Sequence, residues 1–392
     1  MKKILIITVL LLLLCVAGSG WCVNIQETKK QAEQGDIDAQ LLLGQMYLYG
    51  EGAPKDDKQA LYWLVKAAEQ GYGGAQLFAG SMYYNGEGTP QDYKKAEYWY
   101  RKSAENGFPG AKLGLGRMHL YGKGVPQDDK IAVDWFNQAA GQGHAEAQDA
   151  LARMYINGRG VSQDDKQAAL WFSKAAEQGY AEAQDVLASL YYNGEGVPRD
   201  YKQSAYWFNK AAEQGVAGAQ YQLGRMYLNG AGIPKDDKQA VYWLNKAGEQ
   251  GEARAQYQLG QMYLDGDGTP RDDKQAVYWL SKAAEQDHAG AQAHLGRIYL
   301  NGVRAPEDHK KALYLLNKAA EQGEAGAQGL LGVVYYKGQV IRQDYLLSYV
   351  WLNLSVAQGN ESAIQLRDFV EKKLSSEQLR KAQDLSSKLV KK

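Results

Sequence analysis

The chain has 392 residues, of which 45 are Lys or Arg and 45 are Asp or Glu, so its formal net charge at pH 7 is zero. A neutral chain of this kind lacks the electrostatic footprint of a nucleic-acid-binding protein. With two cysteines, Cys15 and Cys22, it has no disulfide framework, and its stability must come from packing.

The first segment is typical of a secretory signal peptide. Lys2 and Lys3 precede an apolar run over residues 4–16, and small residues follow at 17–19. The apolar run is shorter than the about 20 residues that a membrane-spanning helix needs. We therefore expect a bacterial signal peptide over residues 1–19, no transmembrane anchor, and export to the periplasm or out of the cell.

After this segment the sequence repeats with a period of 36 residues and without insertions. The alanine that begins each repeat recurs at Ala39, Ala75, Ala111, Ala147, Ala183, Ala219, Ala255, Ala291 and Ala327. A fixed period of this length predicts a solenoid, in which each unit is stabilised by its neighbours. Because no linker interrupts the period, we expect one elongated repeat domain.

Each repeat contains two helix patterns. In the repeat that begins at Ala219, apolar residues fall on one helical stripe before Gly230, and a second stripe runs from Ala240 to Ala247. Between them Pro234 blocks helix propagation, and Asp236 is placed to cap the second helix. In the last repeats the second turn glycine is replaced by Arg304 and Val340, so we expect altered turns there.

The pattern AQxxLGxMYxxGxGxPxDxxKAxxWxxKAAEQG resembles the Sel1-like repeat family, a relative of the tetratricopeptide repeats, over about residues 31–362. The resemblance implies an all-α, right-handed superhelix of about nine helix-turn-helix repeats, and an adaptor or scaffold for protein complexes. Some cysteine-rich relatives have been assigned penicillin binding or β-lactamase activity. They carry a disulfide in each repeat, which this chain lacks, so we do not expect that activity here.

The non-periodic ends are expected to cap the solenoid. We predict an N-terminal capping helix over residues 24–38, nine repeats over 39–362, and a C-terminal helical cap over 363–392. In the last segment Ser375 is a candidate N-cap residue, because Gln378 follows at the spacing of a capping box.

The sequence shows no recognisable catalytic or metal-binding pattern. The five histidines do not share a repeat slot, and no pair has the spacing of a zinc motif. The acidic residues around Asp265 to Asp273 slightly resemble a calcium loop, but helix capping accounts for them better. We therefore expect a protein that is not an enzyme, with no metal and no cofactor.

The tryptophans recur at one slot of the second helix, which indicates a packing role in a shared cavity between helices. They are Trp63, Trp99, Trp135, Trp171, Trp207, Trp243, Trp279 and Trp351.

Two slots of the first helix vary from repeat to repeat, and both lie on one helix face. In tetratricopeptide-like superhelices the first helices line the concave groove, so this face is the predicted partner-binding surface, with exposed aromatic and guanidinium groups. A solvent-exposed face with ion pairs, such as Asp149 with Arg153, explains the same variation. The candidate residues are Arg117, Arg153, Tyr221, Arg225, Tyr257, Gln261 and Arg297.

Two classes of function are compatible with these observations. The first is an exported, monomeric scaffold that binds a protein or peptide in its groove and acts in host interaction or envelope assembly. The alternative is a peptidoglycan-binding, glycan-binding or hydrolytic envelope protein, which would need a carboxylate pair in a pocket. The carboxylates occupy mainly capping slots, so the sequence favours the scaffold.

Overall fold

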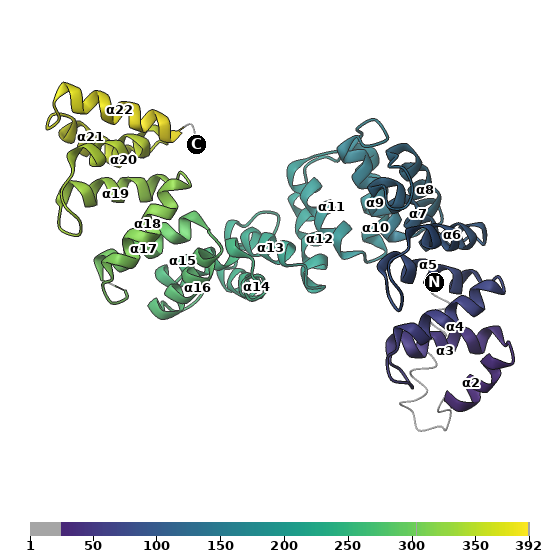
Figure 1. Cartoon of the computed structure of the whole chain (residues 1–392). Coiled ribbons are helices and arrows are strands. Elements are labelled where there is room, and N and C mark those ends of the chain that lie inside the picture. Colours follow the sequence, from purple (N-terminus) through teal and green to yellow (C-terminus); the bar gives the residue numbers. More distant parts are fainter. Residues whose placement is uncertain (1–24, 303, 391–392) are drawn as a thin grey trace. The chain divides into compact units, whose positions relative to one another are not determined.

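The computed structural model describes residues 25–302 and 304–390. The predicted signal peptide lies outside these residues. The described chain contains twenty-one α-helices, α2 to α22, one short 3-10 helix and no strand. Antiparallel helix pairs follow one another along the chain (Figure 1), which confirms the all-α repeat solenoid.

The helix bounds keep the register of the sequence repeat. The first helices of the repeats are α3 (Ile37–Tyr49), α5 (Gly73–Asn85), α7 (Pro109–Tyr121), α9 (Ala145–Asn157), α11 (Ala181–Asn193), α13 (Ala217–Asn229), α15 (Ala253–Asp265), α17 (Ala289–Asn301) and α19 (Ala325–Lys337). The second helices are α4 (Asp57–Glu69), α6 (Tyr93–Glu105), α8 (Asp129–Gly141), α10 (Asp165–Glu177), α12 (Tyr201–Glu213), α14 (Asp237–Glu249), α16 (Asp273–Glu285), α18 (His309–Glu321) and α20 (Tyr345–Ala357). The flanking elements are α2 (Ile25–Glu33), η1 (Glu361–Ala363), α21 (Ile364–Glu371) and α22 (Ser376–Val390).

The chain divides into two compact units, and the division falls within α11. The first unit comprises the described residues up to Ala183 together with Glu195–Val197, and the second comprises Gln184–Gly194 and the described residues from Pro198 onward. Each unit is described by itself below.

The ends of the helices follow from the turn residues. Asp236 accepts hydrogen bonds from the backbone N–H groups of Lys238 and Gln239 at 3.0 Å, as an N-cap residue does. At the end of α13, Gly230 has φ +66° and closes the helix in the left-handed conformation. A Cβ on Gly232 would lie 2.1 Å from the carbonyl oxygen of Tyr201, so glycine is required there by both its positive φ and its close packing.

Small residues bring the two helices of a repeat together. A Cβ on Gly224 of α13 would lie 2.8 Å from Cγ of Leu244 on α14. Leu244, which is fully buried, therefore fills the space opposite this glycine, and its neighbour Trp243 packs elsewhere. In three central repeats the residue equivalent to Leu244 is a buried phenylalanine, Phe136, Phe172 or Phe208.

The tryptophans pack against the preceding repeat. Trp243 of α14 joins the cluster that contains Phe208 and Leu223, and Trp279 of α16 joins the cluster that contains Leu244. Four of the eight are buried, with exposures of 6 to 9%: Trp63, Trp99, Trp243 and Trp279. The other four are half-buried: Trp135, Trp171, Trp207 and Trp351. Each unit thus uses this slot to cover the junction between consecutive repeats.

A glutamine ladder links neighbouring repeats where the first helices begin and the second helices end. Nε2 of Gln220 donates to the carbonyl oxygen of Ala212 at 3.0 Å, and Nε2 of Gln250 donates to Oε1 of Gln220 at 2.8 Å. The same pair recurs in both units, for example between Gln178 and Gln148 at 2.7 Å. Because Gln220 is 3% exposed, its side chain satisfies polar groups that water cannot reach.

The last helices pack on the final repeat. Buried Val370 of α21 and Ala382 of α22 share a cluster with Leu352 of α20. The predicted capping box is confirmed, because the N–H of Gln378 donates to Oγ of Ser375 at 3.3 Å and the N–H of Ser375 donates to Oε1 of Gln378 at 3.0 Å. That α2 and α22 cap the solenoid stays a prediction. Among the described residues, no helix has the length and apolarity needed to cross a membrane.

Candidate protein-binding surface

The surface formed by the first helices of each unit is here called the first-helix face, and neighbouring first helices contact one another in parts of it. In the first unit α5 contacts α7 and α7 contacts α9, and in the second unit α17 contacts α19. The two variable slots of the repeat lie on this face. Arg117 and Arg153 belong to the first unit, and the five other predicted partner-binding residues belong to the second.

Both predicted partner-binding arginines of the first unit are paired with carboxylates. Arg117 donates from Nη2 to Oε1 of Glu146 at 2.6 Å. Arg153 makes two hydrogen bonds to Asp149, from Nε at 2.8 Å and from Nη2 at 3.1 Å, within one helix. Burial raises the pKa of the Asp149 carboxyl, and the bonds from Arg153 oppose this rise. These two guanidinium groups are therefore already neutralised on the surface itself.

A cavity of about 390 Å³ opens on the first-helix face of the first unit. Its walls come from α5 and α7, with Tyr100 of α6 and with His144 and Glu146 from the start of the next repeat. Leu77, Phe78 and Leu113 make much of the wall apolar, and Arg117 lies at the same opening.

The structure corrects the expectation that Tyr221 is exposed. The residue is only 9% exposed, because its ring joins the core cluster of α14 and α15 and is also covered by two arginines. Cζ of Arg254 lies 4.6 Å and Cζ of Arg225 lies 5.6 Å from the ring centroid. Tyr221 is thus a packing residue that supports the two guanidinium groups.

Tyr257 is half-buried and anchors a group of rings. It stacks on His288 at a centroid distance of 4.6 Å and meets His294 edge to face at 5.5 Å. Nε2 of Gln261 donates to its hydroxyl group at 3.0 Å, and burial raises the pKa of this hydroxyl. The structure therefore brings Tyr257 and Gln261 together.

Arg297 lies between two cavities on the first-helix face of the second unit. The first, of about 310 Å³, is here called the polar cavity because six of its eight lining residues are polar, and the second, of about 420 Å³, has a mainly apolar lining. Arg297 contributes to the walls of both. It is exposed, and none of the described carboxylates forms an ion pair with it. The guanidinium group of Arg297 is therefore available to an anionic ligand, whereas those of Arg117 and Arg153 are already paired.

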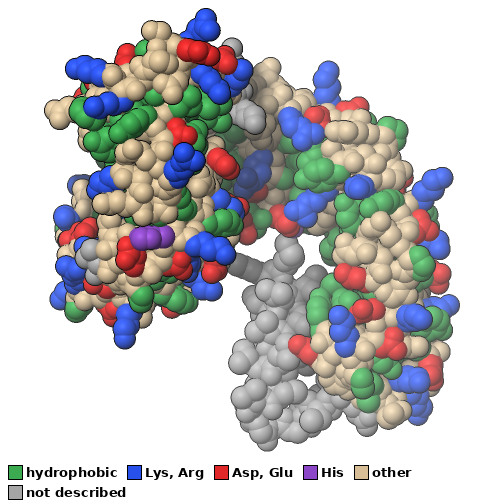
Figure 2. Space-filling model, turned by 60° about the vertical axis from the view of Figure 1, so that its left-hand side comes forward, with side chains coloured by type: hydrophobic (Ala, Val, Ile, Leu, Met, Phe, Trp, Pro, Cys, Tyr) green, Lys and Arg blue, Asp and Glu red, His purple; other side chains and the backbone are tan. Residues whose placement is uncertain are grey.

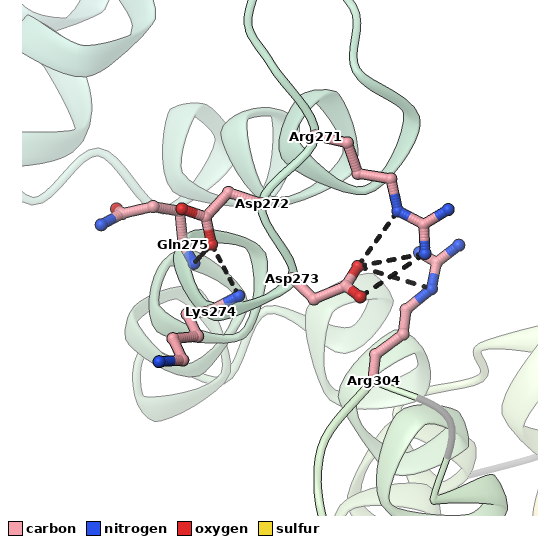
Figure 3. Close-up of polar contacts among 6 residues, drawn as sticks. All are labelled: Arg271, Asp272, Asp273, Lys274, Gln275 and Arg304. Carbon is pink, nitrogen blue, oxygen red and sulfur yellow. Dashed lines mark hydrogen bonds and ion pairs between the residues drawn. The ribbon is translucent and has the colours of Figure 1, made fainter.

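Arg304, in the altered turn after α17, also lines the polar cavity. Its Nε lies 3.9 Å from Oδ1 of Asp273, which already receives Nη2 of Arg271 at 3.3 Å. Figure 3 shows the two guanidinium groups meeting this single carboxylate while Asp272 caps α16. Val340, which replaces the same glycine in the next repeat, does not have the positive φ of that glycine, which confirms an altered turn there.

Two of the five histidines cap helices. Nδ1 of His144 accepts the N–H of Ala147 at 3.3 Å, and Nδ1 of His288 accepts the N–H of Ala291 at 3.2 Å, so both cap a first helix. Burial lowers the pKa of both imidazoles. Within the part of the chain that the structure describes, no three His, Cys, Asp or Glu residues are grouped to hold a metal ion.

A second row of surface residues, which lies on the second helices, was not identified from the sequence. This row follows the period of the repeat and could have been found from it. The residue before the tryptophan slot is an exposed tyrosine in six repeats, in five of which a tryptophan follows and in one of which Leu315 does: Tyr62, Tyr98, Tyr206, Tyr242, Tyr278 and Tyr314. In five of these repeats the lysine four residues later lies over the tyrosine ring, as Lys246 does over Tyr242 at 4.7 Å. In Figure 2 the basic and acidic side chains are interspersed over the visible face, as expected for a neutral chain.

These features define a helical-repeat scaffold with its variable residues on the first-helix face. The model of the Sel1 repeat matches nine times, at residues 37–72, 74–108, 109–144, 145–180, 181–216, 217–252, 253–288, 289–324 and 325–360. The chain therefore belongs to the Sel1 repeat family.

Two solved bacterial structures are similar to this chain over most of its length. A protective antigen present in uropathogenic Escherichia coli strains, which displays an SLR fold, is 33% identical over 94% of this chain and 95% of its own, with a TM-score of 0.54. A Sel1 repeat protein from Oxalobacter formigenes is 35% identical over 83% of this chain and 93% of its own, with a TM-score of 0.57. The comparison with curated proteins found no match.

Proposed function

We propose that this chain is a protein-binding scaffold that holds a peptide segment of its partner on the first-helix face. The observation that carries the proposal is the position of three cavities, of about 390, 310 and 420 Å³. The first two open between first helices, and the third opens between α19, α20 and α21 beside Arg297 of α17. All three include residues of the slots at which the repeat varies. Concave, partly apolar sites with a few polar groups are the usual places for a bound ligand segment.

The packing beneath the face supports this role. The face rests on glycine and alanine contacts such as Gly224 with Leu244, and on the buried glutamine ladder. These contacts hold the first helices in place before a partner arrives. A pre-ordered surface loses less conformational entropy on binding, so more of the contact energy contributes to affinity.

We further propose that the protein is exported and acts outside the cytoplasm, in envelope assembly or in contact with a host. The support is the sequence of residues 1–19, with its two lysines, apolar run and small residues. The similar uropathogenic protein is described as a protective antigen, which fits a protein that host immunity reaches. N-terminal sequencing of the protein recovered from periplasm and medium should find a start near residue 20. A chain that keeps residues 1–19 in the cytoplasm would contradict export.

The binding role is tested by capture with a blocked face. Purified full chain is immobilised and exposed to bacterial envelope extract and to host-cell extract, and the retained proteins are identified by mass spectrometry. The blocked variant carries Ser81→Trp and Val333→Trp, because both residues line cavities and neither is fully buried. The control variant carries Tyr62→Ala and Tyr278→Ala on the second helices, where both rings are about half exposed.

We expect a partner that the parent and the control variant retain and the blocked variant loses. Circular dichroism should show the same helicity for all three proteins. If the blocked variant retains the partner as well as the parent does, the proposal is contradicted. The interface would then lie on the second helices or the turns.

A further inference from the structure

The second unit offers a polar cavity and an apolar cavity that share one wall residue, Arg297. Gln261, His294 and Asn301 supply hydrogen-bonding groups to the polar cavity, and Arg304 adds a second guanidinium group. A segment bound across both cavities must pass Arg297. The two cavities therefore act as adjoining subsites for one chain.

The charge of the polar cavity favours an anion. Its walls hold two guanidinium groups, from Arg297 and Arg304, and one carboxylate, from Asp265. Arg304 shares Asp273 with Arg271, so that carboxylate cannot neutralise both arginines (Figure 3). Burial first, and then Arg297, lower the pKa of His294, which is therefore neutral at pH 7 and can donate or accept one hydrogen bond.

The contrast with the first unit shows that the arginine slot alone does not make an anion site. Arg117 and Arg153 occupy the equivalent slot, and each is already paired with a carboxylate at 2.6 to 2.8 Å. Arg297 has no such partner among the described residues. Arg225, in the same slot, also lacks a carboxylate partner within the described part of the chain, but it lies over the ring of Tyr221 and lines neither cavity. Arg297 is therefore the arginine of this slot that combines an unpaired guanidinium group with an adjacent apolar cavity.

The walls of the apolar cavity come mainly from aliphatic side chains of three helices. Leu330 and Val333 of α19, Leu352 of α20 and Leu366 of α21 line it, together with Gly329. Such a wall accepts an aliphatic side chain, since burial of apolar surface contributes about 25 cal/mol per Å².

We infer that the second unit binds a peptide segment in which an Asp or Glu residue stands within two positions of an aliphatic residue. The side-chain carboxylate forms a charge-assisted, bidentate pair with Arg297. The aliphatic side chain occupies the cavity beside Gly329. This inference rests on the proposed function and specifies the chemistry of the partner.

The test is a selection from a library of random 12-residue peptides displayed on phage, carried out in parallel on the full chain and on the Arg297→Gln variant. Peptides enriched on the parent should carry Asp or Glu within two positions of Leu, Ile, Val or Met, and this motif should disappear from the Arg297→Gln selection. Enriched sequences are then synthesised with an acetylated N-terminus and an amidated C-terminus, so that no terminal carboxylate remains. Replacing the acidic residue by Gln or Asn should raise Kd about tenfold, as expected for the loss of a charge-assisted pair.

Two further variants separate the subsites. Val333→Trp should fill the apolar cavity and raise the Kd of the acetylated and amidated peptides about tenfold. Arg199→Gln, which changes an exposed arginine in a turn, should leave this Kd unchanged. The melting temperatures of all variants are measured to verify folding. The inference is overturned if the two selections enrich the same peptides, or if binding needs a free C-terminal carboxylate. Enriched peptides without an acidic residue would overturn the inference and leave the proposed function standing, whereas a chain that enriches no peptide and captures no partner would contradict both.

Discussion

The guanidinium group of Arg153 forms a two-bond pair with the carboxylate of Asp149, one turn earlier on α9, at 2.8 and 3.1 Å. The two partners differ in exposure, because the Asp149 side chain is 9% exposed and that of Arg153 is 49% exposed. The consequence of removing one partner therefore depends on which charge remains. A lone Arg153 can be hydrated, but a lone Asp149 is a charge held away from water.

The first prediction follows from this asymmetry. Arg153→Ala should lower the free energy of unfolding by about 2 to 3 kcal/mol, and Asp149→Ala by about 1 kcal/mol or less. The double variant should recover part of the Arg153→Ala loss. In Arg153→Ala the pKa of Asp149 should rise further, so this variant should gain stability relative to the parent as the pH falls toward 4. Denaturant titrations at pH 7 and pH 4.5 measure these differences, and equal losses for the two single variants would contradict the assignment.

The glutamine ladder provides a second prediction. Gln220→Leu removes the donor to Ala212 and the acceptor for Gln250, and the buried carbonyl oxygen then lacks this partner. We expect a loss of about 1 to 3 kcal/mol in unfolding free energy. Gln250→Ala is the comparison, because Gln250 is exposed and Gln220 keeps its bond to Ala212. It should cost less than Gln220→Leu in the same thermal melts, and a neutral Gln220→Leu would show that the ladder does not stabilise the repeats.

The third prediction concerns the packing of Trp243. Trp243→Ala should cost about 3 to 5 kcal/mol, the usual range for a large-to-small change in a core, because the indole ring covers the junction with Phe208 and Leu223. Tyr242→Ala is the natural control, since Tyr242 is adjacent in sequence and 48% exposed. It should cost far less. A Trp243→Ala protein that melts like the parent but loses its partner would make Trp243 a ligand contact.

Protonation of the capping histidines gives a pH dependence. His144 and His288 accept helix N–H groups through Nδ1, and burial lowers the pKa of both imidazoles from the usual 6.5. Because the unfolded chain takes up these protons first, stability is fully present above pH 6.5 and falls as the pH drops below that value. Each lost cap should cost about 1 kcal/mol.

The matched variant for this dependence is His288→Asn, since asparagine caps helices and does not titrate. The fall in melting temperature between pH 7.5 and pH 5.5 should be smaller in His288→Asn than in the parent. An identical fall in both proteins would exclude His288 as a source. His294, whose pKa is also lowered, contributes to the remaining dependence.

The fold could be predicted because the sequence repeats with a constant period, and this period sets the register of the helices. Ala219, Gly230, Asp236 and Trp243 fix helix starts, stops and packing in one period, and the structure keeps that period. The detail of the core was harder to predict. The residue opposite Gly224 is Leu244, since close helix contact is set by the direction of the side chain and not by its size.

The site could be predicted only in part. Arg297 is exposed on α17, whereas Tyr221 is buried and arginines from two repeats converge on its ring. Whether an arginine is neutralised depends on a spatial neighbour, as with Arg117 and Glu146, which are 29 residues apart. The cavity beside Gly329 also depends on α21, which packs against α20 and lies outside the repeat pattern.

The most direct test of the account places a photo-crosslinking amino acid at single positions and asks which ones reach the captured partner. Benzoylphenylalanine is introduced at Ser81 or Val333 on the first-helix face, and at Tyr62 or Tyr278 on the second helices. After irradiation with the partner, mass spectrometry identifies each crosslinked product. We predict crosslinks from Ser81, Val333 or both, and none from the two second-helix positions. Crosslinks from Tyr62 or Tyr278 alone would contradict the claim that this solenoid binds its partner on the first-helix face.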